Sequence, residues 1–140
     1  MFSGAYEHTV DDKGRTVIPI GMRQRLGQTL VVTRGMNGCL WLFGDARWTE
    51  VQKTFSPASL LDLRGIKLER YFLGGAHELE PDKQGRVPIP QILMDHAGIS
   101  PGSTIWIVGL MDRIEIWEKS RWEAFNAEVA EELLSEVESP

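Results

Sequence analysis

The chain has 140 residues, 42% of them hydrophobic, and its formal net charge of −5 argues mildly against a nucleic-acid partner. This length fits one ordinary domain or two very small ones, and the hydrophobic share excludes a disordered chain. No apolar run approaches the roughly 18 residues of a membrane helix, no signal-peptide pattern opens the chain, and the single cysteine, Cys39, excludes an internal disulfide.

The first part of the chain predicts a β-rich unit that contains one short helix. Its expected strands cover residues 5–10, 15–18, 29–33 and 40–43. A helix of about two turns is expected to start near Pro19, where a missing backbone N–H has little consequence, and to end at Gly27. The last two strands flank a turn and are expected to pair as a hairpin.

The middle of the chain predicts a helical connector over residues 48–75. Trp48, Val51 and Phe55 are spaced i, i+3, i+7, which places them on one face of a helix. Ser56 then predicts the cap of another helix, with Pro57 in its first turn.

The second part of the chain repeats the plan of the first. Its expected strands cover residues 76–80, 86–89, 104–108 and 114–117. A short helix is expected between Pro90 and Gly98. Ser120 and Glu123 fit a capping box, which predicts the start of a last helix.

Charge is distributed unevenly along the chain. Residues 1–36 carry five basic and three acidic side chains, whereas residues 118–140 carry two basic and seven acidic ones. The negative total therefore comes mainly from the tail, and a basic contact surface remains compatible with it. The tail itself fits either a solvated helix face or a surface for a basic partner.

A nine-residue motif occurs twice, and it is the strongest signal in the sequence. Residues 11–19 read DDKGRTVIP and residues 82–90 read DKQGRVPIP, at a spacing of 71 residues. A unit of about 65 residues buries only about 60% of its unfolded surface, so neither copy is expected to be stable alone. We therefore expect the copies to pair about a pseudo-two-fold axis and to complete one barrel-like sheet. The expected divisions are 5–47, 48–75, 76–119 and 120–140.

The repeated motif predicts a tight turn with basic side chains. Asp11 is expected to accept hydrogen bonds from backbone amides a few residues later, and Gly14 supplies the positive φ that such turns require. Arg15 begins the next strand, and a two-stranded ribbon can enter the DNA major groove, where arginine recognises guanine or phosphate. A purely structural turn, braced by an Asp–Arg pair, is the alternative interpretation.

At these residues the chain resembles the MraZ family. The opening MFSGAYEHTVDDKGRTVIP and the later DKQGRVPIP are similar to that family's two half-motifs, each with an Asp-x-x-x-Arg core. The resemblance implies an α+β fold of two pseudo-symmetric, swapped-hairpin AbrB-like halves that form a β-barrel flanked by helices. It also implies a cytoplasmic, nucleoid-associated transcriptional regulator that forms a ring-shaped homo-oligomer. Such a regulator is expected to bind short repeats of double-stranded DNA upstream of its own cell-division and cell-wall genes.

The resemblance assigns DNA binding to the two turns. The residues carried over are Asp11, Lys13, Gly14, Arg15, Asp82, Gln84, Gly85 and Arg86. Because Gln84 stands where the first copy has Lys13, the second turn is expected to bind more weakly.

Other classes of function find little support. His8, His77 and His96 lack metal-ligand spacing, and the sequence has no P-loop, nucleophile elbow or HExxH motif. Cys39 lies in a predicted strand and is expected to be a small core residue. We therefore expect no enzymatic activity, small-molecule substrate, metal or cofactor. A self-assembling protein-interaction module that does not bind DNA is the remaining alternative.

Overall fold

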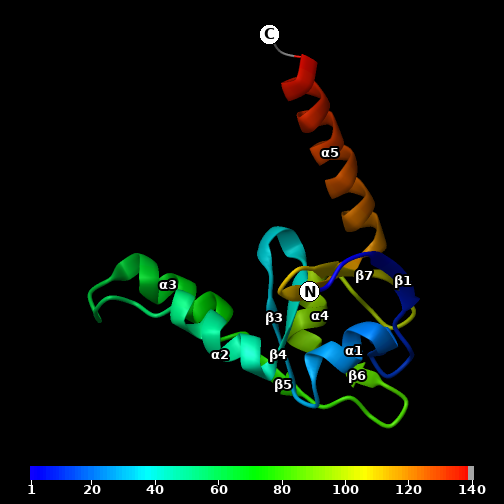
Figure 1. Cartoon of the computed structure of the whole chain (residues 1–140), viewed down its shortest axis with the longest axis horizontal. Helices are drawn as coiled ribbons and strands as arrows, with labels where there is room; N and C mark the ends of the chain where they lie inside the picture. The colour runs from blue at the N-terminus through cyan, green and yellow to red at the C-terminus, as the bar shows by residue number, and fades with distance from the viewer. Residues whose placement is uncertain (139–140) are drawn as a thin grey trace.

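The computed structural model describes residues 1–138, and its strands form two antiparallel sheets (Figure 1). The strands are β1 (Ala5–Thr9), β2 (Arg15–Val17), β3 (Leu30–Arg34), β4 (Leu40–Gly44), β5 (His77–Leu79), β6 (Arg86–Pro88), β7 (Thr104–Leu110) and β8 (Arg113–Glu118). The helices are α1 (Ile20–Leu26), α2 (Asp45–Thr54), α3 (Leu63–Phe72), α4 (Gln91–Ala97), α5 (Lys119–Glu138) and the 3-10 turn η1 (Met36–Gly38). Every strand predicted from the sequence is present, with each end within two residues of its expected position.

The strand order shows that the two copies of the repeat are interleaved. The larger sheet has the order β1-β7-β8-β4-β3-β5, so the first strand of each copy pairs with a strand of the other copy. The smaller sheet consists of β2 and β6, again one strand from each copy. The α+β class predicted from the sequence is therefore confirmed.

The single closed barrel predicted from the sequence is not formed by the described strands. Strands β1 and β5 are the two edges of the larger sheet, and neither continues into the smaller one. The reason lies in β2 and β6, which are three residues long and pair only with each other.

Alternation along the strands divides the core between the two faces of the larger sheet. The neighbours Val31 and Val32 of β3 enter different clusters because successive strand residues point to opposite faces. Val32 packs in the largest cluster with side chains of α1 and α4 and of the small sheet. Val31 packs with Trp48 of α2 and Phe72 of α3. The small sheet, α1 and α4 therefore lie on one face, and α2 and α3 lie on the other.

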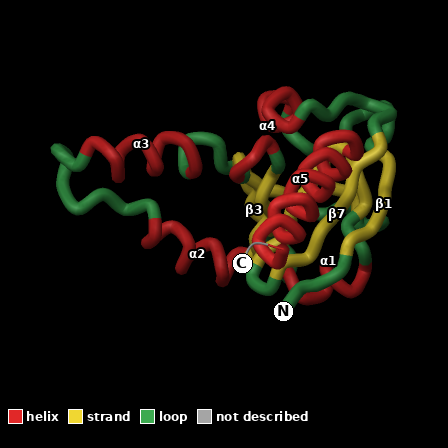
Figure 2. The backbone as a smooth tube through the Cα atoms, turned by 90° about the horizontal axis from the view of Figure 1, so that it is seen from above, coloured by secondary structure: helices red, strands yellow, loops and turns green. Residues whose placement is uncertain are grey.

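Two helical segments extend away from the sheets (Figures 1 and 2). The arm made by α2 and α3 is anchored at its base, where Phe55 and Phe72 stack with ring centroids 4.4 Å apart. Helix α5 is anchored at its start, where Trp122 packs on Trp117, and then projects away from β7 and β8. No helix within residues 1–138 combines the length and the apolar character that crossing a membrane requires.

Two predicted helix starts are wrong, and in both cases a nearby carboxylate caps the helix instead. Helix α3 begins at Leu63, not near Ser56, because Asp62 accepts a hydrogen bond from the backbone N–H of Gly65 at 3.0 Å. Helix α5 begins before Ser120. There Glu118 accepts the backbone N–H of Ser120 at 2.7 Å, so a capping box at Ser120 is not needed.

Candidate nucleic-acid interface

The first turn is organised by the carboxylate of Asp11. Its Oδ1 atom accepts backbone N–H groups from Lys13 at 2.9 Å and from Arg15 at 2.8 Å, and Oδ2 accepts Nε of Arg15 at 2.8 Å. The backbone hydrogen bond from Arg15 is the main reason that the pKa of Asp11 lies below its ordinary value. The carboxylate is therefore ionised at neutral pH, and the predicted role of Asp11 in the turn is confirmed.

The second turn has the same geometry. Oδ1 of Asp82 accepts the backbone N–H groups of Gln84 and Arg86, both at 2.9 Å, and Oδ2 accepts Nε of Arg86 at 2.7 Å. The pKa of Asp82 is lowered chiefly by the backbone hydrogen bond from Arg86. The two motifs that look alike in the sequence are therefore alike in their hydrogen bonds.

Each turn is held by the other copy through its glycine. Gly14 and Gly85 have φ of 76° and 79°, a left-handed backbone that side chains disfavour. The carbonyl of Gly14 accepts the N–H of Ile89 at 3.0 Å, and the carbonyl of Gly85 accepts the N–H of Ile18 at 3.3 Å. These bonds extend the β2–β6 pairing, so the two turns belong to one hydrogen-bonded unit.

The β2–β6 register brings both arginines to one face. Arg15 pairs with Pro88 and Val17 pairs with Arg86, and paired residues of antiparallel strands point to the same side. The central pair of the ribbon, Thr16 and Val87, is buried on the opposite side. Arg15 and Arg86 are thus diagonal neighbours on the outer face. Ordinary sheet geometry places the Cα atoms of such neighbours about 7–8 Å apart.

The arginines keep part of their guanidinium groups available. Asp11 and Asp82 engage only the Nε atoms. Within residues 1–138, no hydrogen bond or ion pair involves Nη1 or Nη2 of Arg15 or Arg86. A guanidinium fixed at Nε and open at both terminal nitrogens can donate two parallel hydrogen bonds to a phosphate or a guanine edge.

The tips of the turns carry further polar side chains. Lys13 and Gln84 are exposed, as the sequence predicts for groups that contact a ligand. Lys83 is also exposed at the second tip, and sequence reasoning missed it. The sequence did contain a signal for Lys83. The alignment of the two copies that matches Lys13 with Gln84 also matches Asp12 with Lys83, so the second tip has a basic residue where the first has an acidic one.

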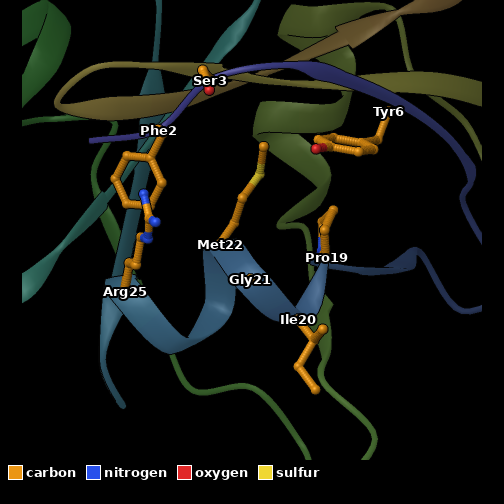
Figure 3. Close-up of a pocket in the computed structure, with 8 residues that line it drawn as sticks. All are labelled: Phe2, Ser3, Tyr6, Pro19, Ile20, Gly21, Met22 and Arg25. Atoms are coloured by element: carbon orange, nitrogen blue, oxygen red, sulfur yellow. The ribbon is translucent and has the colours of Figure 1, made fainter.

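A hollow in the surface beside the N-terminal segment offers no catalytic constellation. It has a volume of about 410 Å³ and lies between the N-terminal segment and α1, with Tyr6 and Arg25 among its lining residues (Figure 3). Its lining contains no carboxylate, histidine or cysteine. Elsewhere, burial raises the pKa of the Cys39 thiol, which favours the protonated form over the nucleophilic thiolate. Among the described residues, no cluster of three or more His, Cys, Asp or Glu side chains could hold a metal ion.

Comparison with solved structures adds little to this description. The chain is 21% identical to the protein in "The solution structure of PHS018 from Pyrococcus horikoshii", with a TM-score of 0.36 over 81% of this chain and 94% of that one. So low a score carries no argument about fold or function.

Comparison with protein families and curated proteins is decisive. The family model described as "MraZ protein, putative antitoxin-like" matches residues 1–64 and 72–139. A transcriptional regulator MraZ from Ligilactobacillus salivarius is 40% identical over 98% of this chain and 94% of its own length. One from Acetivibrio thermocellus is 37% identical over 91% and 88%, and one from a Thermoanaerobacter species is 38% identical over 97% and 95%. The chain therefore belongs to the MraZ family, a family of transcriptional regulators that are not enzymes.

Proposed function

We propose that this chain regulates transcription by binding double-stranded DNA in a sequence-specific manner through its two Asp-x-x-x-Arg turns. The observation that carries the proposal is the position of Arg15 and Arg86 on one exposed face, each fixed at Nε and open at Nη1 and Nη2. A turn built only for stability would not need two arginines that point outward together.

The residues of the turns divide the work of recognition. The arginines donate to phosphate oxygens or to guanine, and Lys13 adds a positive charge for phosphate. Gln84 has the amide that pairs with adenine in the major groove. Asp11 and Asp82 touch no DNA in this proposal, because their role is to hold the arginines in a fixed rotamer before binding, which reduces the entropy lost on binding.

We further propose that the two copies are pseudo-symmetric, AbrB-like halves over residues 5–47 and 76–119. The pairing of β1 with β7, β5 with β3, and β2 with β6 supports exchange of strands between the halves. Residues 48–75 then act as a connector and residues 120–140 as a tail.

The proposed working form is a ring of identical subunits. The arm exposes Leu60, Leu61 and Leu63, of which Leu60 is 88% exposed, and α5 exposes Leu133, Leu134 and Val137. Exposed apolar side chains on a projecting arm and a projecting helix are suited to burial against another copy. A ring presents many turns to one duplex, so weak contacts of single subunits combine through effective concentration.

Family membership supports the proposed target. We infer repression of the chain's own cell-division and cell-wall gene cluster, through short promoter repeats, by a cytoplasmic protein associated with the nucleoid. The relatives are described as transcriptional regulators, which supports a role in transcription without naming the target genes.

Fluorescence anisotropy on a labelled duplex from upstream of the chain's own gene tests the proposal. Arg15→Ala and Arg86→Ala are expected to weaken binding by about ten-fold or more and to reduce its salt dependence. Lys53→Ala is the matched control, because it removes one exposed charge from α2, across the larger sheet from the turns. Size-exclusion chromatography checks that each variant keeps its oligomeric state.

The outcomes separate the candidate functions. Equal binding by the wild type and both arginine variants would place the DNA contact elsewhere and make the turns structural. Oligomerisation of the wild type without binding to this duplex or to the promoter repeats would favour the protein-interaction module.

A further inference from the structure

We propose that Arg23 is a third DNA-binding arginine, provided by the helix of the first copy to the turn of the second. This inference rests on the proposed function, since it adds a contact to the same DNA-binding face. It makes the second turn the stronger of the two, contrary to what Gln84 alone predicts.

The position of Arg23 is defined by its contact with Gly85. A Cβ atom built on Gly85 would overlap Nη1 of Arg23 and would lie 2.5 Å from its Cζ. The guanidinium of α1 therefore occupies the space that a side chain at the turn would take. The absence of a Cβ at Gly85 thus has two effects. It permits the left-handed backbone of the turn, and it leaves space for the Arg23 guanidinium.

The first turn has an apolar group in the corresponding place. There the sulfur of Met94, on α4, lies 3.2 Å from the Cβ position of Gly14. Met94 is the residue that aligns with Arg23 at the repeat spacing of 71. The two copies therefore place homologous side chains on each other's turns, and only one of these side chains is charged.

This difference increases the imbalance of charge between the two turns. Residues 11–15 contain two acidic and two basic side chains, which sum to zero. Residues 82–86 contain one acidic and two basic side chains, and Arg23 raises the total at that turn to +2. A phosphate is attracted to the more positive of two otherwise similar sites.

Arg23 is also available to a ligand. It is half-buried, and its backbone N–H donates to the carbonyl of Pro19 at 2.9 Å. Its guanidinium makes no hydrogen bond or ion pair with any group in residues 1–138. It lines a hollow of about 380 Å³ beside the second turn, together with Glu80 and Pro81. Glu80 is the one acidic residue of that lining and forms no ion pair with Arg23. The guanidinium is therefore held by packing, and its hydrogen-bond donors can face a phosphate.

The test compares Arg23→Met with Arg25→Met on the same promoter duplex across a salt series. Met is the side chain that the other copy already uses in this place, so the fold should tolerate it. Arg25→Met removes the same charge from the same helix, two residues further along. We expect Arg23→Met to weaken binding about ten-fold and to lower the slope of log K against log salt by about 0.9 for each contacting subunit.

Two additional variants sharpen the result. Arg23→Lys retains the charge and should recover most of the salt slope, which a merely structural role would not require. Arg86→Ala should weaken binding more than Arg15→Ala, because it acts at the more basic turn.

The failure of this inference is distinguishable from the failure of the proposed function. Wild-type affinity and salt slope in Arg23→Met would overturn the role of Arg23 and leave DNA binding intact. An equal loss in Arg23→Met and Arg25→Met would also overturn it, because the effect would then follow net charge. Absence of binding by the wild type would overturn the proposed function itself.

Discussion

The indole Nε1 of Trp41 donates a 2.8 Å hydrogen bond to Oε2 of Glu115, across the strand pair where the two copies meet. The other oxygen of Glu115 accepts Nε1 of Trp117 at 2.9 Å. Glu115 is only 9% exposed, and Nη2 of Arg113 lies 3.6 Å from Oε2. One buried acidic group thus joins β4 to β8 and satisfies two indole donors.

Glu115→Gln is expected to destabilise the fold by about 1–3 kcal/mol. An amide has a single acceptor oxygen, so its NH₂ group must face one of the two indole N–H groups and one donor loses its partner. Urea unfolding followed by tryptophan fluorescence measures the change, with Glu78→Gln on the exposed face of β5 as the control. Equal midpoints for the two variants would contradict the prediction.

Gly85→Ala is expected to weaken DNA binding more than Gly14→Ala does. Both substitutions place a Cβ on a left-handed backbone, at a cost of about 1–2 kcal/mol each. At Gly85 the methyl group also displaces the Arg23 guanidinium, whereas at Gly14 it meets the flexible side chain of Met94. Urea unfolding should show a similar loss of stability for both variants, and DNA binding should fall further for Gly85→Ala. Equal DNA affinity in the two variants would argue against a role for Arg23.

The turn aspartates should make stability depend on pH in the acid range. The pKa values of Asp11 and Asp82 lie below the ordinary 3.8 in the folded chain, so the unfolded chain binds protons first as pH falls. Their contribution is therefore complete above pH 3.8 and is lost as pH falls through the lower folded-state values. A variant with both Asp11→Asn and Asp82→Asn should show a flatter stability profile between about pH 5 and pH 2. A profile parallel to the wild type would contradict this assignment.

Cys39 should resist thiol reagents in the native protein. Burial is the main cause of its raised pKa, and the negative charge of Glu115 adds to the effect. Its Sγ donates to the carbonyl of Met36 at 3.2 Å. Ellman's reagent at pH 8 should therefore react with the thiol in urea and not in buffer. Rapid reaction in buffer would mean that this part of the sheet opens readily.

The sequence was most informative where local pattern and repetition agreed. The strands were predicted closely because each combines β-branched residues with a flanking turn, and because two copies report on each other. The roles of Asp11 and Asp82 in the turn were likewise predictable, since an Asx turn is formed by residues close together in the chain.

The features that were mispredicted depend on competition or on distance. Glu118 and Ser120 are both able to cap α5, and backbone geometry decides between them. Arg23 reaches Gly85 across 62 positions of sequence, and only the exchange of strands between the copies brings them together. The open edges of the larger sheet were also unpredictable from local sequence, because strand pairing is decided by residues far apart in the chain.

Interleaving of the copies has a consequence for the exposed loop at the tip of the arm, over residues 56–62. A protease cut there would leave two fragments whose strands remain paired to one another in four places, β1 with β7, β4 with β8, β5 with β3 and β2 with β6. Neither fragment contains a complete DNA-binding face, yet the nicked protein should keep one. Two separately expressed pieces should therefore reconstitute the whole, as the subunits of a heterodimer do.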